Sequence, residues 1–204
     1  MATIQPPPVS TPILLDTGVM SLTWIAWFQS IHLKLNQGKS LITLADLEMA
    51  SSQDFEAGIS TSHDVYEIEL TNVLLSSLDS SLLLRASIDS GDNYLEVSNA
   101  YGWSRQDNGN TSYTNSYHSL MLTPQTSNNQ ENYEISGVIR LVDLSNELSY
   151  KMVQWSLSYF DSSDTFQVVE GCGHIKTALP VNAIRILPSA GSISSGTIAF
   201  HSLD

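Results

Sequence analysis

Positively charged residues are scarce in this sequence. Its 204 residues contain 8 Lys and Arg against 21 Asp and Glu, which gives a net charge of -13. Nucleic-acid binding needs clustered cations that displace counterions from phosphates, and attraction to anionic lipids needs them as well. We therefore expect neither a nucleic acid nor a membrane as a partner. The acidic residues are not in runs, which is typical of a solvated, self-repelling surface.

Cysteine is almost absent, because Cys172 is the only one. This excludes an intramolecular disulfide and the small disulfide-rich scaffolds of secreted proteins. The apolar runs are too short to cross a bilayer, and the N-terminus lacks the basic segment of a signal peptide. The chain is long enough to bury a core, and its length favours one main domain with a terminal extension.

Catalytic signatures are missing too. The sequence contains no nucleophile elbow, phosphate-binding glycine loop, zinc-protease helix or cysteine pair. Cys172 and His174 would share one face of a strand, so a nucleophilic thiol with a histidine partner is conceivable. A single cysteine in an apolar strand is more typical of a small buried side chain, and we favour that interpretation. The histidines have no ligand spacing, and a hairpin turn explains Asp89–Asn93 better than a cation loop. We therefore expect no enzyme, no metal site and no cofactor.

The N-terminal segment has a distinctive pattern. Pro6, Pro7 and Pro8 predict an extended arm over residues 1–12. A helix is predicted from Met20 to Gly38, and at 100° per residue its large apolar side chains form one narrow stripe. The stripe consists of Trp24, Trp27, Phe28, Ile31 and Leu35.

This stripe is too apolar to leave in water, so we assign it to an interface with a partner protein or with sister copies. Spacings of 4, 3 and 4 from Trp24 through Phe28 and Ile31 to Leu35 permit a short parallel bundle. The alternative is that the helix folds back and closes one open end of the chain's own β-domain. Residues 1–38 are thus predicted to be an arm with an anchoring helix.

The remainder of the chain has the patterns of β-structure. Residues 39–58 are predicted to be a linker with a first strand at Ser40–Met49, and residues 59–204 a β-domain. Short alternating segments recur there with turn residues between them, and no helical pattern intervenes. The prediction is an antiparallel β-sandwich of about nine or ten strands, with the jelly roll as the favoured version.

Several local predictions follow the same patterns. A hairpin turn at Ser90–Asn93 is predicted to lead into a strand over Tyr94–Trp103. Residues 104–116 are predicted to form a polar loop with Asn108–Gly109 at its tip. Gly171–Gly173 is predicted to be a bulge or bend in a strand.

In the strand predicted at Tyr150–Phe160, alternation separates an apolar set of side chains from a polar one. The set predicted to face inward is Lys151, Val153, Trp155, Leu157 and Tyr159.

Aromatic residues flank the predicted polar loop and suggest a glycan-binding site. Sugars stack on flat aromatic rings while amides and carboxylates bind their hydroxyls, and the loops of sandwich folds present such groups. The alternative is that Tyr101 and Trp103 end a strand and cover the edge of the core. The candidate glycan-binding residues are Tyr101, Trp103, Asn108, Tyr113 and Tyr117.

Two segments resemble structural proteins of tailed bacteriophages. Many of these begin, as residues 1–31 do, with a proline run, a short apolar segment, a turn and a helix with a Trp-x-x-Trp-Phe core. Residues 181–204 are similar to the closing motif of phage tail and tail-fibre β-sandwich domains. The matching residues there are Ile184, Arg185, Ile186, Ser189, Gly191, Ile193, Ser195, Gly196 and Thr197. The last strand departs from the family ending L-Y-G, since it has Phe200, His201 and Ser202.

The resemblance implies a virion protein of tail-fibre or spike type, located in the tail or, as the second choice, on the capsid surface. Residues 1–38 would attach it to other virion proteins, and the sandwich would project. A homo-oligomer is implied, with a trimer favoured, and host-surface glycan is a candidate ligand. The alternatives are a capsid decoration (cement) protein and a non-catalytic carbohydrate-binding module.

Overall fold

The computed structural model describes residues 38–124, 133–161 and 163–203. These residues form strands, turns and loops, without a helix, so the described part of the chain is mainly β. Leu41–Leu203 form one compact unit. The predicted anchoring residues lie outside the described residues, and their role stays a prediction. They are Trp24, Trp27, Phe28, Ile31 and Leu35.

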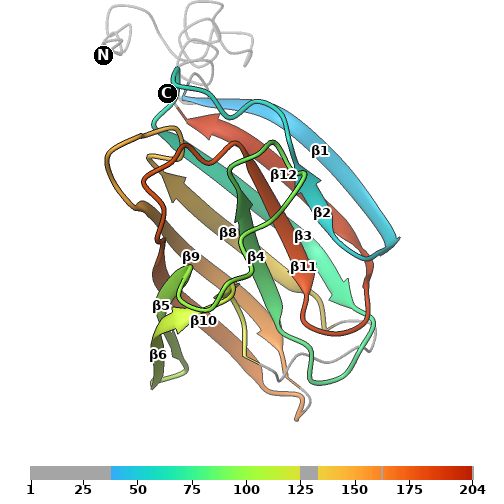
Figure 1. Ribbon diagram of the computed structural model, residues 1–204. Helices are drawn as coiled ribbons and strands as arrows, with labels where there is room; N and C mark the ends of the chain where they lie inside the picture. The colour runs from blue at the N-terminus through green and yellow to red at the C-terminus, as the bar shows by residue number, and fades with distance from the viewer. Residues whose placement is uncertain (1–37, 125–132, 162, 204) are drawn as a thin grey trace, which may run out of the picture. The chain divides into compact units, whose positions relative to one another are not determined.

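Twelve strands are described, and they form two sheets (Figure 1). In spatial order the large sheet contains β1 (Lys39–Ala50), β12 (Ile193–Leu203), β3 (Val65–Leu75), β8 (Ile135–Val142), β9 (Lys151–Phe160), β10 (Phe166–Ile175), β5 (Tyr101–Asp107) and β6 (Asn110–Tyr117). The small sheet contains β2 (Gln53–Phe55), β11 (Ala183–Pro188), β4 (Leu82–Ser87) and β7 (Leu120–Met121). From β12 to β6, and throughout the small sheet, neighbouring strands are antiparallel.

The chain changes sheets repeatedly along its length. β1, β3, β8 and β12 of the large sheet alternate in sequence with strands of the small sheet, except that β4 and β7 follow one another within the small sheet. The hairpin β5–β6 and the pair β9–β10 interrupt this alternation, and all four of these strands extend the large sheet beyond β8. The fold is therefore a two-sheet body with two insertions on one side.

The core lies between the facing sides of the two sheets. Phe55 of β2 packs on Phe200 of β12 with 5.0 Å between ring centroids, and Phe200 stacks on Tyr66 of β3 at 5.5 Å. The inward set predicted for β9 is buried along its whole length, because that strand has one face in the core and one in solvent.

Two predicted elements are wrong. Residues 88–100 form a loop instead of a strand; Leu95 N–H donates to the Ala86 carbonyl at 2.9 Å, and the next strand begins only at Tyr101. The polar loop predicted at 104–116 is mostly the hairpin β5–β6. Its turn is at Asn108–Gly109, where both φ angles are positive, at 42° and 93°. The hairpin was missed because β6 is an exposed edge strand whose Ser, Thr and Asn side chains resemble those of a loop.

The bulge predicted at Gly171–Gly173 is also wrong, since β10 pairs without interruption with β9 and β5. These glycines allow close packing. A Cβ atom on Gly171 would lie 2.2 Å from Cζ2 of Trp155, and one on Gly173 would lie 2.5 Å from Cδ2 of Leu120.

Candidate functional site

The two insertions create a broad exposed surface on the side of the large sheet that faces away from the core. We call it the outer face, and define it as the even-numbered residues of β8, β9, β10 and β5 together with Tyr113 of β6. Strand register places these side chains in rows. One row runs through Arg140, Gln154, Cys172, Ser104 and Tyr113.

The outer face carries little charge. Among its residues as defined, Arg140 and Glu170 are the only Lys, Arg, Asp or Glu. Arg140 Nε donates to Oε2 of Glu67 on β3 at 2.9 Å. Glu67 and Glu69 of β3 lie on the same side of the sheet, opposite Arg140 and Val138, just outside the residues of the outer face.

A hollow of about 300 Å³ lies on this face among β5, β6, β9 and β10. We call it the glycine hollow, because Gly102 and Gly173 contribute backbone to its lining. Tyr113 stands beside it with 76% of its surface exposed. Ser104 adds a hydroxyl group and Asn115 an amide. The hollow therefore combines an accessible aromatic ring with hydrogen-bonding groups.

His174 gives the hollow a second aromatic surface. Its ring stacks on that of Tyr150, with 6.2 Å between centroids and 10° between planes. It also lies over Gly102, where an added Cβ would be 2.5 Å from Cε1 of the imidazole. Burial, and then the charge of Lys176, lower the pKa of His174. Its imidazole is therefore neutral at physiological pH and can both donate and accept a hydrogen bond.

Cys172 lines the same hollow and is exposed, so the expectation of a small buried cysteine is wrong. It shares its face of β10 with His174, as the two-residue spacing predicts.

The candidate glycan-binding residues are separated by the fold. Tyr101 is buried in the core, where its hydroxyl accepts from Ala86 N–H at 2.9 Å and donates to the Leu95 carbonyl at 3.1 Å. Burial raises its pKa. Trp103 pairs with Thr114, one position away from Tyr113 in the register, and so lies on the opposite side of the sheet.

The other two candidates also differ in their surroundings. Tyr117 packs edge-on against Trp103, with 6.3 Å between ring centroids. Asn108 donates from Nδ2 to the Phe166 carbonyl at 3.1 Å and accepts from Val168 N–H at 3.3 Å, which ties the β5–β6 turn to the start of β10. Of the five candidates, Trp103 and Tyr113 contribute to the lining of the glycine hollow, and of these two Tyr113 has the exposed side chain. The candidates lie in different surroundings because the strand register determines the side of the sheet on which each side chain lies. The sequence alone does not reveal that register.

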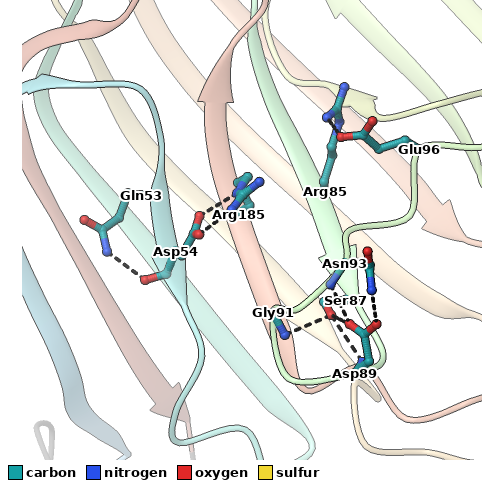
Figure 2. Close-up of polar contacts among 9 residues, drawn as sticks. All are labelled: Gln53, Asp54, Arg85, Ser87, Asp89, Gly91, Asn93, Glu96 and Arg185. Carbon is teal, nitrogen blue, oxygen red and sulfur yellow. Dashed lines mark hydrogen bonds and ion pairs between the residues drawn. The ribbon is translucent and has the colours of Figure 1, made fainter.

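A polar cluster on the small sheet has a structural role. Arg185 of β11 binds both carboxylate oxygens of Asp54 of β2, and Arg85 of β4 pairs with Glu96 of the loop 88–100 (Figure 2). The Arg185 guanidinium also lies 3.9 Å from the centre of the Tyr94 ring. Burial and the charge of Asp54 raise the pKa of Tyr94 to about 12. These contacts fix the loop against the sheet.

Asp89 organises the turn at the start of that loop. Its carboxylate accepts from the Ser87 hydroxyl at 2.6 Å and from both the backbone and side-chain amides of Asn93 at 2.9 Å (Figure 2). The Ser87 bond, followed by the two from Asn93, lowers the pKa of Asp89 to about 2. Within the described residues no group of three or more His, Cys, Asp or Glu could hold a metal ion.

In the part of the chain that the structure describes, no helix has the length and apolar character to cross a lipid bilayer. The chain matches no protein-family model, no curated protein and no solved structure.

Proposed function

We propose that this chain is a structural component of a tailed-bacteriophage particle, of tail-fibre or spike type, with a jelly-roll body. The strand order carries the proposal. Without the two insertions, the large sheet has the order β1-β12-β3-β8 and the small sheet β2-β11-β4-β7. In this arrangement the chain changes sheets at every connection except that from β4 to β7, which are neighbours in the small sheet, as in jelly rolls of two four-stranded sheets. Jelly rolls occur in viral capsid and lectin domains.

Two polar groups with lowered pKa values, Asp89 and Lys151, have structural roles, which supports a non-catalytic function. The carboxylate of Asp89 accepts hydrogen bonds from Ser87 and Asn93 of its own turn. Lys151 is buried and donates to the carbonyls of Asn146 and Ser149, and burial lowers its pKa. Buried or paired groups of this kind hold loops in place and are not available for chemistry.

Attachment through residues 1–38 is supported by the self-sufficiency of the body. The described core residues, from Leu47 to Phe200, all belong to Leu41–Leu203. The body therefore has a core built from its own strands, and we propose that the aromatic stripe contacts another virion protein.

Deletion of residues 1–37 tests the attachment. The shortened chain is expected to keep its β-type circular dichroism and cooperative melting but to be lost from purified particles. Trp27→Glu is expected to have the same effect in the full-length chain, while Val97→Glu, at an exposed position of the body, is the matched control. Normal incorporation of the shortened chain would contradict the anchoring role.

A second candidate function, glycan binding, is favoured by the glycine hollow. Tyr113 and the stacked pair of Tyr150 and His174 offer flat aromatic surfaces, and Ser104 offers a hydroxyl beside them. The acidic chain would repel sulfated or sialylated glycans, so the ligand is a neutral glycan. Tyr113→Ala should abolish binding on a glycan array without changing the melting temperature, and Leu179→Ala should leave binding intact. Absence of binding by the wild-type chain would remove this candidate.

A further inference from the structure

We propose that the outer face binds an extended, uncharged polysaccharide chain, which lies across β8, β9, β10, β5 and β6 and fills two neighbouring hollows. This inference rests on the glycan-binding candidate of the glycine hollow. It goes further by naming the ligand as a chain of several sugar units instead of a single terminal sugar.

A second hollow lies beside the glycine hollow on the outer face. Its volume is about 250 Å³, and we call it the glutamine hollow because Gln154 of β9 lines it with an exposed side chain. Arg140 and Val138 of β8 line it as well, together with Ser156 of β9. The outer face therefore offers two recesses on adjacent strands.

The two hollows lie on one line that runs across the strands. The partner of Gln154 on β10 is Cys172, which lines the glycine hollow. The same register row begins at Arg140 and ends at Tyr113. Neighbouring strands are about 4.8 Å apart, so this row of five strands is about 19 Å long. A single sugar ring would occupy one hollow, whereas an extended chain of several rings would occupy both.

The side chains along this line have the chemistry that binds sugars. Gln154 and Ser156 are exposed, and no side-chain hydrogen bond to another described residue occupies them. Amide and hydroxyl groups both donate and accept, as the hydroxyl groups of a sugar do. Tyr113 adds an exposed ring on which the apolar face of a pyranose can stack. Flat aromatic rings with a few uncharged hydrogen-bonding groups suit a neutral glycan.

The carboxylates around the row exclude an anionic chain. Glu170 is exposed on the outer face, and Glu67 and Glu69 lie beside that face on β3. Arg140, the cation of the outer face, already pairs with Glu67. These carboxylates would repel a sulfated or sialylated polysaccharide, whereas an uncharged chain meets no such repulsion.

The sheet holds the row in place before a ligand arrives. β9, β10 and β5 are interior strands, each paired on both sides, so the spacing of their side chains is fixed. Little backbone entropy is therefore lost on binding. The row ends at Tyr113 on β6, an edge strand, so a long chain can continue past it.

Calorimetric titration of the full-length chain with neutral oligosaccharides tests the proposal. The probes are straight, β-1,4-linked oligomers of glucose, mannose, xylose and N-acetylglucosamine, each from the disaccharide to the hexasaccharide. In the series that binds best, the hexasaccharide should bind at least about tenfold more tightly than the disaccharide, because it fills both hollows.

Variants at each hollow separate the two contributions. Gln154→Ala should weaken binding of the hexasaccharide about fivefold, as for the loss of one hydrogen bond, and leave binding of the disaccharide unchanged. Tyr113→Ala should weaken binding of both. Leu179→Ala, at an exposed position outside the outer face, is the control and should bind both like wild type. Unchanged melting temperatures would show that the variants fold.

The outcomes distinguish this proposal from the one on which it rests. Equal affinities for disaccharide and hexasaccharide, or wild-type binding of the hexasaccharide by Gln154→Ala, would overturn the extended chain and leave glycan binding at the glycine hollow standing. Binding of none of the oligomers would also overturn the extended chain, while the glycan array tests the glycine hollow separately.

Cys172 provides a native probe of the position of the bound chain. It is the only cysteine and lies between Gln154 and Ser104 in the register row. Saturating hexasaccharide should therefore slow its labelling by a maleimide. Labelling at an unchanged rate would place the bound chain elsewhere and contradict the proposal.

Discussion

Arg185 donates from Nε and Nη2 to the two carboxylate oxygens of Asp54, at 2.7 and 2.6 Å (Figure 2). The pair joins β11 to β2, an edge strand of three residues. A bidentate, charge-assisted pair is stronger than a neutral hydrogen bond and fixes the relative orientation of both side chains. It compensates for the few backbone bonds that so short a strand can form.

Asp54→Ala is expected to lower the free energy of unfolding by about 1–2 kcal/mol, because Arg185 loses its partner at a half-buried site. Urea unfolding monitored by tryptophan fluorescence measures the change. Glu48→Ala, which removes an exposed carboxylate from β1, is the control and should have little effect. Equal stability of the two variants would contradict a structural role for the pair.

Tyr101→Phe tests the assignment of this tyrosine to the core. Removal of the hydroxyl leaves Ala86 N–H and the Leu95 carbonyl without their buried partner, and the expected loss is about 1–2 kcal/mol. Hydrogen exchange at the Ala86 amide should become faster. Wild-type stability together with an altered glycan profile would instead place Tyr101 in a binding site.

Gly171→Ala should destabilise the sandwich by about 1–3 kcal/mol, because the new methyl group would overlap the Trp155 ring. Gly109→Ala is the comparison. Its added Cβ would meet nothing within 4 Å, so the cost comes only from the positive φ of 93° and should be about 1 kcal/mol. Thermal melting of the two variants checks the order, and a smaller loss for Gly171→Ala would contradict the close packing of β10 on Trp155.

The lowered pKa of Asp89 should make the stability of the fold depend on pH in the acid range. Hydrogen bonds from Ser87 and Asn93 hold its pKa at about 2 in the folded chain, against 3.8 for the free side chain. A lowered pKa in the folded state stabilises the protein above pH 3.8, and this contribution disappears as the pH falls towards about 2. The difference in melting temperature between wild type and Asp89→Asn should therefore shrink over that range. A difference that is independent of pH would contradict this assignment.

The sequence predicted the elements whose two faces differ in polarity. Alternation identified the buried side of β9 because that strand separates core from solvent. β6 was not predicted as a strand, because it is an edge strand with mostly exposed polar residues. The strand predicted over Tyr94–Trp103 failed for another reason: after β4 the chain crosses to the other sheet, which a local turn signal at Asp89 does not reveal.

The candidate site was predicted only in part, because side-chain direction depends on register. Tyr113 lies on the outer face. Trp103 pairs with Thr114, the residue after Tyr113, and its side chain therefore lies on the other side of the sheet. Phe160, Phe166 and His174 are brought onto one surface by the pairing of β9 with β10 and of β10 with β5. The alternation of side chains within each strand can be predicted from the sequence. The sequence does not tell which strands are neighbours, so it does not show that these three residues share one surface.

Quantitative mass spectrometry of purified phage particles tests the central claim most directly. A tail-fibre or spike component should be present at a few to some tens of copies per particle, and deletion of residues 1–37 should remove it. Hundreds of copies would make the chain a capsid decoration protein. Complete absence of the chain from purified particles would contradict the proposal that it is a structural component of the virion.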